Sequence, residues 1–330
     1  MSVMSLKEYE IFYRLTQLTQ KGLITSIEQF LKNRYEKVVK TDSYIYAIGD
    51  IPITLVAHLD TVFSKPPSEI FYDTNKNVIW GVGGLGADDR AGVYSILKLI
   101  NGIKKPHIIF TTDEEQGSIG AKQLVKDVPT PFADMRYIVE LDRQGSKDCV
   151  FYQCDNPDFT NYISSFGFEE NFGTFSDISE ICPAWKIAGV NLSIGYKDEH
   201  SLIERLYIDD MFNTIDKVNR MIEDIPNLKE NFKYIPVNPK TFYQKYVISS
   251  PWYDGSLIEC HRCHKNFSDY EMFYVQELSG EYNFWCPNCI SNNINWCSRC
   301  GEPFESYNEE IKMCIDCERE KENANVQSEH

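Results

Sequence analysis

Residues 107–127, HIIFTTDEEQGSIGAKQLVKD, combine a short apolar run, a turn with two adjacent glutamates, and a segment with apolar residues at helical spacing. The first part predicts a buried strand, and the last part predicts a helix that starts near Gly120. A strand that leads through a polar turn into a helix is the unit from which α/β sheets are built. This stretch therefore predicts the fold class of the segments around it.

The alternation of strands and helices extends along most of the chain. Apolar spacing predicts two N-terminal helices at 6–20 and 24–38, one from about Arg90 to Ile100, and a long amphipathic helix at 208–225. Short β-rich runs lie between them, in SYIYAIG, ITLVAHL, VIWGV, RYIVEL and GVNLSIG. We expect an α/β fold with three layers, α/β/α, around a mixed or largely parallel sheet.

Acidic residues and histidines stand where several of the predicted strands end. In sheets of this kind, ligands bind beyond the carboxyl ends of the strands. Seven such side chains follow strands or lie in the loops GLGADDRAG and GYKDEHSLIE: His58, Asp60, Asp88, Glu114, Glu115, Asp142 and His200. Together they supply nitrogen and oxygen ligands, a bridging carboxylate and a spare acid, which a two-metal hydrolase requires.

The six histidines of the chain narrow the choice of nitrogen ligands. Two lie among the C-terminal cysteines, one is the last residue, and one opens a strand after a proline. His58 and His200 remain as the expected ligands. Two histidines and three carboxylates would complete the shells of two zinc ions.

The motifs HLDTV, GADDRAG, DEEQG, ELD and DEHSLIE, in this order, resemble those of the co-catalytic zinc exopeptidases. This superfamily includes peptidase T, the bacterial leucyl aminopeptidases and the acetylornithine-type deacylases. The resemblance covers roughly residues 50 to 225. It implies two catalytic zinc ions, or other divalent metals, with five ligands: His58 and Asp142 on one ion, Glu115 and His200 on the other, and Asp88 bridging them.

Two further acids have expected roles beside the metal ligands. Asp60 would orient the His58 imidazole, because a ligating histidine usually donates its other N–H to a neighbouring acceptor. Glu114 is the predicted general base. Adjacent residues at a strand end point in different directions, so Glu115 can bind metal while Glu114 faces the attacking water.

The resemblance implies three finer features around the site. The peptide bond after the bridging aspartate is expected to be cis, which places it at Asp88–Asp89. Glu204 is expected to support the loop that carries the last histidine ligand. Ser176 and Asp177, in GTFSDISE, are expected to lie near the substrate.

Each motif also has an ordinary structural interpretation. The pattern H-x-D is common, a pair of glutamates often starts a solvated helix, and Asp88 could cap a helix N-terminus. The whole series in the order of the family favours a metal site over these alternatives.

Eight of the eleven cysteines form four C-x-x-C pairs after position 259, and no secretory signal is recognisable at the N-terminus. In that context the pairs predict zinc ligands rather than disulfides. Two C-x-x-C knuckles complete one tetrahedral shell. We therefore expect two structural zinc ions, held by Cys260, Cys263, Cys286, Cys289, Cys297, Cys300, Cys314 and Cys317.

The pairing of the four knuckles is open in the sequence. Sequential pairing joins the first with the second and the third with the fourth, whereas cross-braced pairing joins the first with the third. The run CSRCGEPF followed by CIDC resembles a self-contained zinc ribbon and favours sequential pairing. The segment from Cys260 to His264 also matches a haem-attachment motif, but the neighbouring cysteine pairs favour zinc.

The uneven cysteine distribution predicts the domain organisation. We expect a catalytic domain over 1–240, a linker over 241–255, a zinc-ribbon-like module with two four-cysteine sites over 256–320, and a polar tail over 321–330. The ligand motifs lie too close together in sequence for the inserted lid domain that many members of the superfamily carry. The catalytic domain is therefore expected to be minimal.

The sequence predicts a cytoplasmic zinc-dependent exopeptidase, of the aminopeptidase or di/tripeptidase type. An N-acyl amino acid deacylase would use the same site, and a non-catalytic zinc-holding scaffold is the alternative from another class. The formal net charge of −16 argues against nucleic acid or an anionic membrane as a partner. We expect a peptide or N-acyl amino acid substrate, and a protein partner is possible through the zinc module.

Overall fold

The computed structural model describes residues 4–132, 134–173, 175–237, 257–268, 272–290, 294–298, 303–306, 308, 310–319 and 321. The chain divides into two compact units, Met1–Val237 and Asn238–His330. The predicted linker and nearly all of the predicted polar tail lie outside the described residues. The two units are described separately below.

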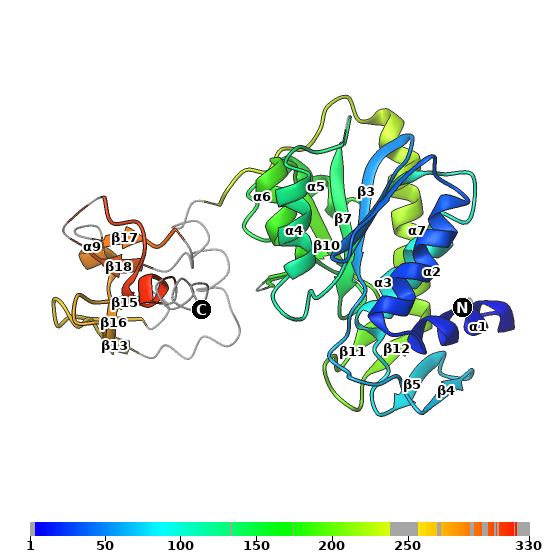
Figure 1. The fold of residues 1–330 in the computed structure, drawn as a ribbon, viewed down its shortest axis with the longest axis horizontal. Helices are drawn as coiled ribbons and strands as arrows, with labels where there is room; N and C mark the ends of the chain where they lie inside the picture. Colours follow the sequence, from blue (N-terminus) through cyan, green and yellow to red (C-terminus); the bar gives the residue numbers. More distant parts are fainter. Residues whose placement is uncertain are drawn as a thin grey trace, which may run out of the picture. The chain divides into compact units, whose positions relative to one another are not determined.

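A mixed eight-stranded sheet forms the centre of the first unit (Figure 1). Its four central strands, β6, β3, β7 and β10, are parallel, and β1 and β2 pair antiparallel with their neighbours. Strand β8 pairs antiparallel with β10 and parallel with β9. In spatial order the strands are β1 (Lys37–Lys40), β2 (Tyr44–Ile48), β6 (Pro106–Thr111), β3 (Ile51–His58), β7 (Tyr137–Arg143), β10 (Gly189–Ser193), β8 (Asp148–Val150) and β9 (Glu169–Glu170).

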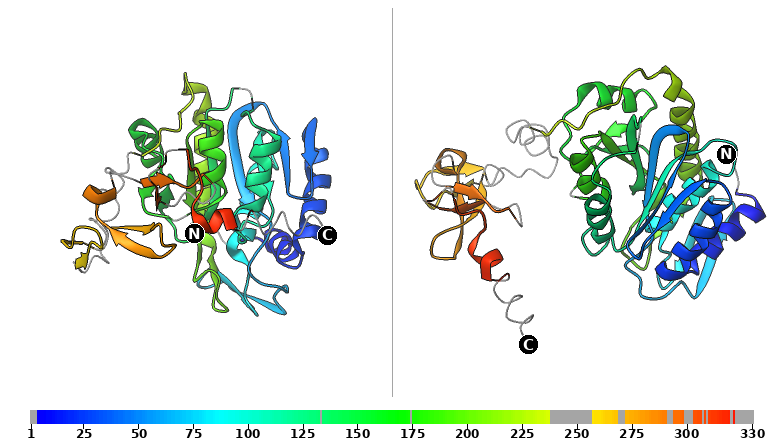
Figure 2. Two further views of the ribbon diagram at one scale, coloured as in Figure 1. Left: turned by 60° about the vertical axis from the view of Figure 1, so that its left-hand side comes forward. Right: turned by 45° about the horizontal axis from the view of Figure 1, so that its top comes forward.

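Helices cover both faces of this sheet, which confirms the predicted three-layer α/β/α fold (Figures 1 and 2). The larger apolar core lies on one face and contains residues of α1 (Leu6–Thr16), α2 (Gln20–Lys32), α3 (Ala87–Leu99), α5 (Pro157–Ser164) and α7 (Ile208–Asp224). The smaller core lies on the other face under α4 (Ile119–Asp127) and α6 (Asp177–Trp185). A short 3-10 helix, η1 (Ile225–Asn227), follows α7.

A second, four-stranded sheet accompanies the main one in this unit. Its spatial order is β11 (Tyr196–Lys197), β12 (Arg205–Tyr207), β5 (Val78–Val82) and β4 (Glu69–Asp73), all antiparallel. We call it the small sheet. Of its strands, the sequence predicted only β5.

The second predicted helix is wrong in its last part. It was expected over 24–38, but α2 ends at Lys32 and the chain then enters β1. Val38 and Val39 are β-branched residues that pair with Ala47 and Tyr46 of β2. Pairing with a neighbouring strand therefore overrides the helical spacing of apolar residues at this point.

The second unit holds a hairpin and a further small sheet. The hairpin is β13 (Leu257–Glu259) with β14 (Asn266–Ser268). The sheet has the order β16 (Tyr282–Trp285), β15 (Phe273–Gln276), β18 (Pro303–Glu305) and β17 (Ile294–Trp296), and a helical turn, α9 (Pro287–Ile290), follows β16. Cysteines form much of its two small cores. Within the described parts of the chain, no helix has the length and apolar character required to cross a bilayer.

Candidate active site and cysteine clusters

His58 is the last residue of β3, and its imidazole is fully buried. Its Nδ1 lies 3.2 Å from Oδ1 of Asp60, so Nδ1–H can donate to that carboxylate. Its Nε2 lies 3.0 Å from Oδ1 of Asp88 and 3.3 Å from Oδ1 of Asp142. The Asp60 contact therefore leaves Nε2 free to bind a metal between these two carboxylates.

Asp60 also fixes the loop that carries the two glutamates. Its Oδ1 accepts the backbone N–H of Glu114, and its Oδ2 accepts that of Glu115, each at 3.0 Å. These bonds and the His58 imidazole lower the pKa of Asp60, although burial works in the opposite direction. One carboxylate thus connects the ends of β3 and β6, a role that the sequence did not predict.

Asp88 lies at the start of α3 in backbone that departs from helical geometry. The Asp88–Asp89 peptide bond is cis, as the resemblance implied. The buried carboxylate of Glu204 accepts the backbone N–H groups of Gly86, Ala87 and Asp88 at 2.6, 3.0 and 3.1 Å. Glu204 therefore holds the Asp88 loop directly, a contact that the sequence did not indicate.

Asp142 is held from β10 and β11. The side chain of Asn191 accepts the backbone N–H of Asp142 at 2.9 Å and donates to its carbonyl at 2.8 Å. The Tyr196 hydroxyl donates to Oδ1 of Asp142 at 3.1 Å. Neither residue was singled out from the sequence, although an asparagine inside an apolar strand is a usable signal of a buried polar contact.

His200 lies in the loop between β11 and β12 and has a left-handed φ of 59°. Its Nε2 lies 3.1 Å from Oδ2 of Asp88 and 3.0 Å from Oε2 of Glu115. With 52% of its side chain exposed, it is far more open to solvent than His58. This half of the site is consequently the one that faces solvent.

The structure therefore brings the five predicted ligands into two groups that share Asp88. In each group the ligand atoms lie within 4.8 Å of one another: His58, Asp88 and Asp142 in one, and Asp88, Glu115 and His200 in the other.

The donor set fits divalent cations. Burial, followed by repulsion from neighbouring carboxylates, raises the pKa of Glu114 to about 9 and that of Glu115 to about 7. Oε1 of Glu115 is buried and accepts no hydrogen bond. Cations between these oxygen and nitrogen donors would offset the repulsion and engage the unsatisfied oxygen.

Ser176 and Asp177 were expected near the substrate, and the structure corrects this expectation. They are 1% and 0% exposed, so neither side chain is open to a substrate. The Asp177 carboxylate accepts the hydroxyl of Thr111 at the end of β6, and Ser176 donates to the buried carboxylate of Glu140. Both residues tie α6 to the sheet beneath the site.

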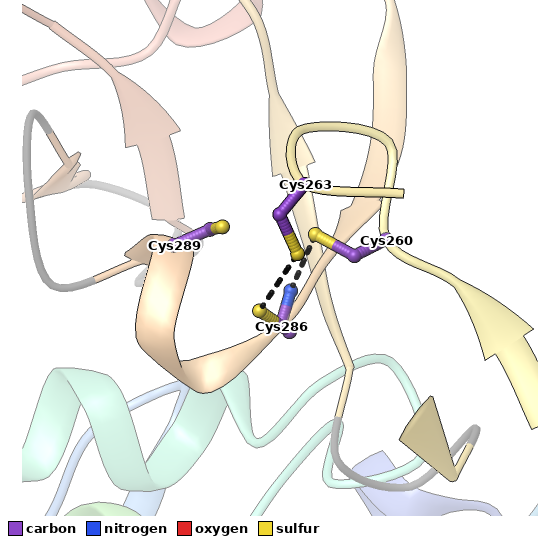
Figure 3. A group of neighbouring side chains, drawn as sticks. All are labelled: Cys260, Cys263, Cys286 and Cys289. Atoms are coloured by element: carbon purple, nitrogen blue, oxygen red, sulfur yellow. Dashed lines mark hydrogen bonds between the residues drawn. The ribbon is translucent and has the colours of Figure 1, made fainter. Parts of the chain in front are cut away.

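The cysteines of the second unit form two clusters. Sγ atoms of Cys260, Cys263, Cys286 and Cys289 all lie within 4.8 Å of one another (Figure 3). The backbone N–H of Cys286 donates to Sγ of Cys260 at 3.2 Å. The first C-x-x-C pair thus meets the second, as sequential pairing predicts.

The second cluster contains Cys297, Cys314 and Cys317, with Sγ atoms at similar separations. The fourth predicted ligand, Cys300, lies outside the described residues. Sulfur atoms gathered in groups of this size suit tetrahedral zinc.

Comparisons with known proteins agree with this geometry. Residues 42–167 match the profile of Peptidase family M28. No curated protein matches the chain in sequence. Of the five candidate metal ligands in the first unit, only His200 lies beyond the matched residues.

Several solved structures share the fold. A tripeptidase of Staphylococcus aureus subsp. aureus Mu50 superposes with a TM-score of 0.56 and 13% identity, covering 69% of this chain and 100% of that chain. The aminopeptidase PepT of Bacillus cereus has a TM-score of 0.52 and 14% identity, covering 68% and 100%. A TET aminopeptidase of a marine sediment Thaumarchaeota archaeon has a TM-score of 0.53 and 13% identity, covering 67% and 99%.

The profile and the fold together define the class of protein, a peptide hydrolase with a three-layer α/β/α domain. More specifically, residues 42–167 match Peptidase family M28, in agreement with the resemblance to the co-catalytic zinc exopeptidases. Peptidases of this family depend on zinc, and the two groups that share Asp88 are the candidate metal-binding residues of the domain.

Proposed function

We propose that the protein is a zinc-dependent exopeptidase of the aminopeptidase or di/tripeptidase type. The observation that carries this proposal is the meeting of two three-residue donor groups at Asp88. His58 and Asp142 would bind one ion, and Glu115 and His200 would bind the second. Asp88 would be a ligand of both ions. The names of the structural neighbours, a tripeptidase and aminopeptidases, support the exopeptidase class.

Zinc bound to these donors would supply Lewis acidity, which polarises the scissile carbonyl and makes water a stronger acid. Glu114 is assigned as the general base. Its side chain is buried, its backbone N–H is held by Asp60, and the charges of His58 and Asp142 act on its carboxyl, which supports this assignment. In the reaction, Glu114 takes a proton as water oxygen bonds to the carbonyl carbon. It returns that proton to the departing nitrogen as the C–N bond breaks.

Glu114→Gln tests this assignment. The amide keeps the shape of the side chain but cannot take up a proton, so kcat should fall by about 10²–10⁴-fold while the zinc content stays the same. Hydrolysis is measured as free-amine release from aminoacyl and from N-acyl substrates. Glu10→Gln, at an exposed site on α1, is the matched control and should retain full activity.

Unchanged turnover in Glu114→Gln would contradict the role of Glu114. Cleavage of the N-acyl substrates alone would replace the exopeptidase proposal with the deacylase, which uses the same chemistry. Absence of hydrolysis with both substrate types in the zinc-loaded protein would favour the non-catalytic scaffold.

We also propose that the two cysteine clusters hold structural zinc ions. The first would use Cys260, Cys263, Cys286 and Cys289, and the second would combine Cys297, Cys314 and Cys317 with Cys300. The ions would take the place of a large apolar core in this unit, where the cysteines themselves make up much of the buried interior. A module stabilised in this way could also dock a protein partner.

A further inference from the structure

The small sheet has one buried and one exposed face. Ile79, Leu206 and Tyr196 lie on the inner face and are 0%, 0% and 2% exposed. On the outer face, Phe71 of β4 and Trp80 of β5 are 41% and 38% exposed. Large aromatic side chains on the outside of a sheet are a common mark of an interaction surface.

The strand register places four outer-face residues in one row across the sheet. Phe71 pairs with Trp80, Trp80 with Arg205, and Arg205 with Lys197. Residues opposite one another in antiparallel strands share a face, so all four point outward. We call them the cross-strand row. Its β4–β5 half is aromatic, and its β12–β11 half is cationic.

Each residue of the row has a contact within the chain, and both halves remain partly exposed to solvent. The Phe71 and Trp80 rings stack on each other, with centroids 5.7 Å apart. The Arg205 guanidinium lies 2.6 Å from the Asp198 carboxylate, in a pair whose side chains are 45% and 40% exposed. The Lys197 ammonium lies 4.8 Å above the Tyr207 ring.

The surroundings of the row add apolar and acidic surface. Val82 shares its face and is 51% exposed, while Leu202 and Ile203, in the β11–β12 loop, are 70% and 66% exposed. Glu69 and Asp73 flank Phe71 on the same face of β4. The acidic residues therefore lie at the edge opposite Lys197.

We propose that this face binds a second copy of the chain around a two-fold axis parallel to the strands, between β12 and β5. Such an axis lays the aromatic half of one row on the cationic half of the other. Trp80 would face Arg205 of the partner subunit, and Phe71 would face Lys197 of the partner subunit. Cation–π contacts of this kind form twice, once on each side of the axis.

The distribution of rings and charges on this face favours a second copy of the chain as its binding partner. A partner that presents cations to the aromatic half and rings to the cationic half complements this face, and a second copy of the same surface supplies both. Glu69 and Asp73 would also come close to Lys197 of the partner subunit. The interface is thus self-complementary, which a two-fold dimer requires. This proposal does not depend on the hydrolytic activity.

Sedimentation of the full chain across roughly 1–100 μM tests the proposal. The natural chain should form a dimer. Trp80→Arg places cation against cation and should raise the dimer Kd at least about tenfold, whereas Trp80→Arg with Arg205→Trp restores the complementary order and should recover most of the affinity. Ile103→Arg, at a loop residue that is 95% exposed, is the control and should leave the dimer intact.

A monomer at every concentration would overturn the proposal, and so would a dimer that Trp80→Arg does not weaken. Failure of the double variant to recover affinity would overturn the proposed axis. Melting curves verify that each variant folds. If Trp80→Arg does not fold, Glu69→Lys and Lys197→Glu take its place, because each alone should weaken the dimer and the two together should restore it.

Discussion

At the scale of single residues, His107 shows how burial sets a protonation state away from the site. It is 4% exposed in β6, and its Nδ1 accepts the backbone N–H of Gly49 at 3.1 Å. Burial lowers the pKa of His107 to about 4, although the nearby Asp50 carboxylate acts against it. The fold therefore requires the neutral imidazole, because a proton on Nδ1 would break the bond to Gly49.

We expect this requirement to make stability depend on pH. Between pH 6.5 and 4 the unfolded chain binds a proton at His107 that the folded chain does not, so the free energy of unfolding falls as pH is lowered. His107→Asn keeps an acceptor for Gly49 but does not titrate. Urea unfolding should show the natural chain losing roughly 3 kcal/mol more than the variant from about pH 7 to about pH 4. Parallel pH profiles would contradict this prediction.

At the scale of secondary structure elements, Glu204 connects the β11–β12 loop with the start of α3. Gly86 has a left-handed φ of 68°, which suits glycine, and its N–H is the first of three that the Glu204 carboxylate accepts. Glu204 is fully buried. The position of Asp88 therefore depends on an acid that is more than a hundred residues away in the sequence.

Glu204→Gln should loosen this connection, because an amide group cannot accept all three N–H groups. We expect a loss of about 2–4 kcal/mol in the free energy of unfolding and weaker metal binding at the Asp88 site. Urea titration and competition with a chelator measure the two effects. Asp198→Asn, at an exposed acid of the same loop, should change stability by less than about 1 kcal/mol. Equal effects of the two variants would contradict the role of Glu204.

At the scale of the whole molecule, the two units differ in how metal would contribute to their stability. The first unit has large apolar cores on both faces of its sheet, so we expect it to stay folded without metal. The cores of the second unit are small and rich in cysteine. Metal removal should therefore affect the units differently.

Metal analysis of the full chain should find about four zinc ions, two in each unit. Mild chelation should remove two and abolish hydrolysis while the circular dichroism of the chain is kept. The other two should be released only when the second unit unfolds. Cys260→Ala removes a ligand from the second unit, and Asp142→Ala removes one from the first. The ions lost from each variant therefore show which unit holds which pair. A total of two ions would mean that either the pair in the first unit or the pair in the second unit is absent.

Much of the first unit could be predicted from sequence because its signals are local. An apolar run followed by His58, Glu115 or Asp142 places a candidate ligand at a strand end, and parallel strands bring those ends to one edge of the sheet. The small sheet was missed because its strands are two to five residues long and join segments far apart in the chain. Strands this short carry little periodic signal.

The sequence by itself predicted the fold class, the resemblance to a peptidase family and the candidate metal-binding residues, because strand ends and ligand types follow from local pattern. Only the tertiary structure decided which side chains support those ligands. Three sets of hydrogen bonds join distant segments of the chain. They link Asp60 to the backbone of Glu114 and Glu115, Glu204 to the backbone of Asp88, and Tyr196 to the Asp142 carboxylate. The physical reason is that a buried polar group needs a hydrogen-bond partner close to it in space. Its position in the sequence does not indicate which distant residue the fold places next to it.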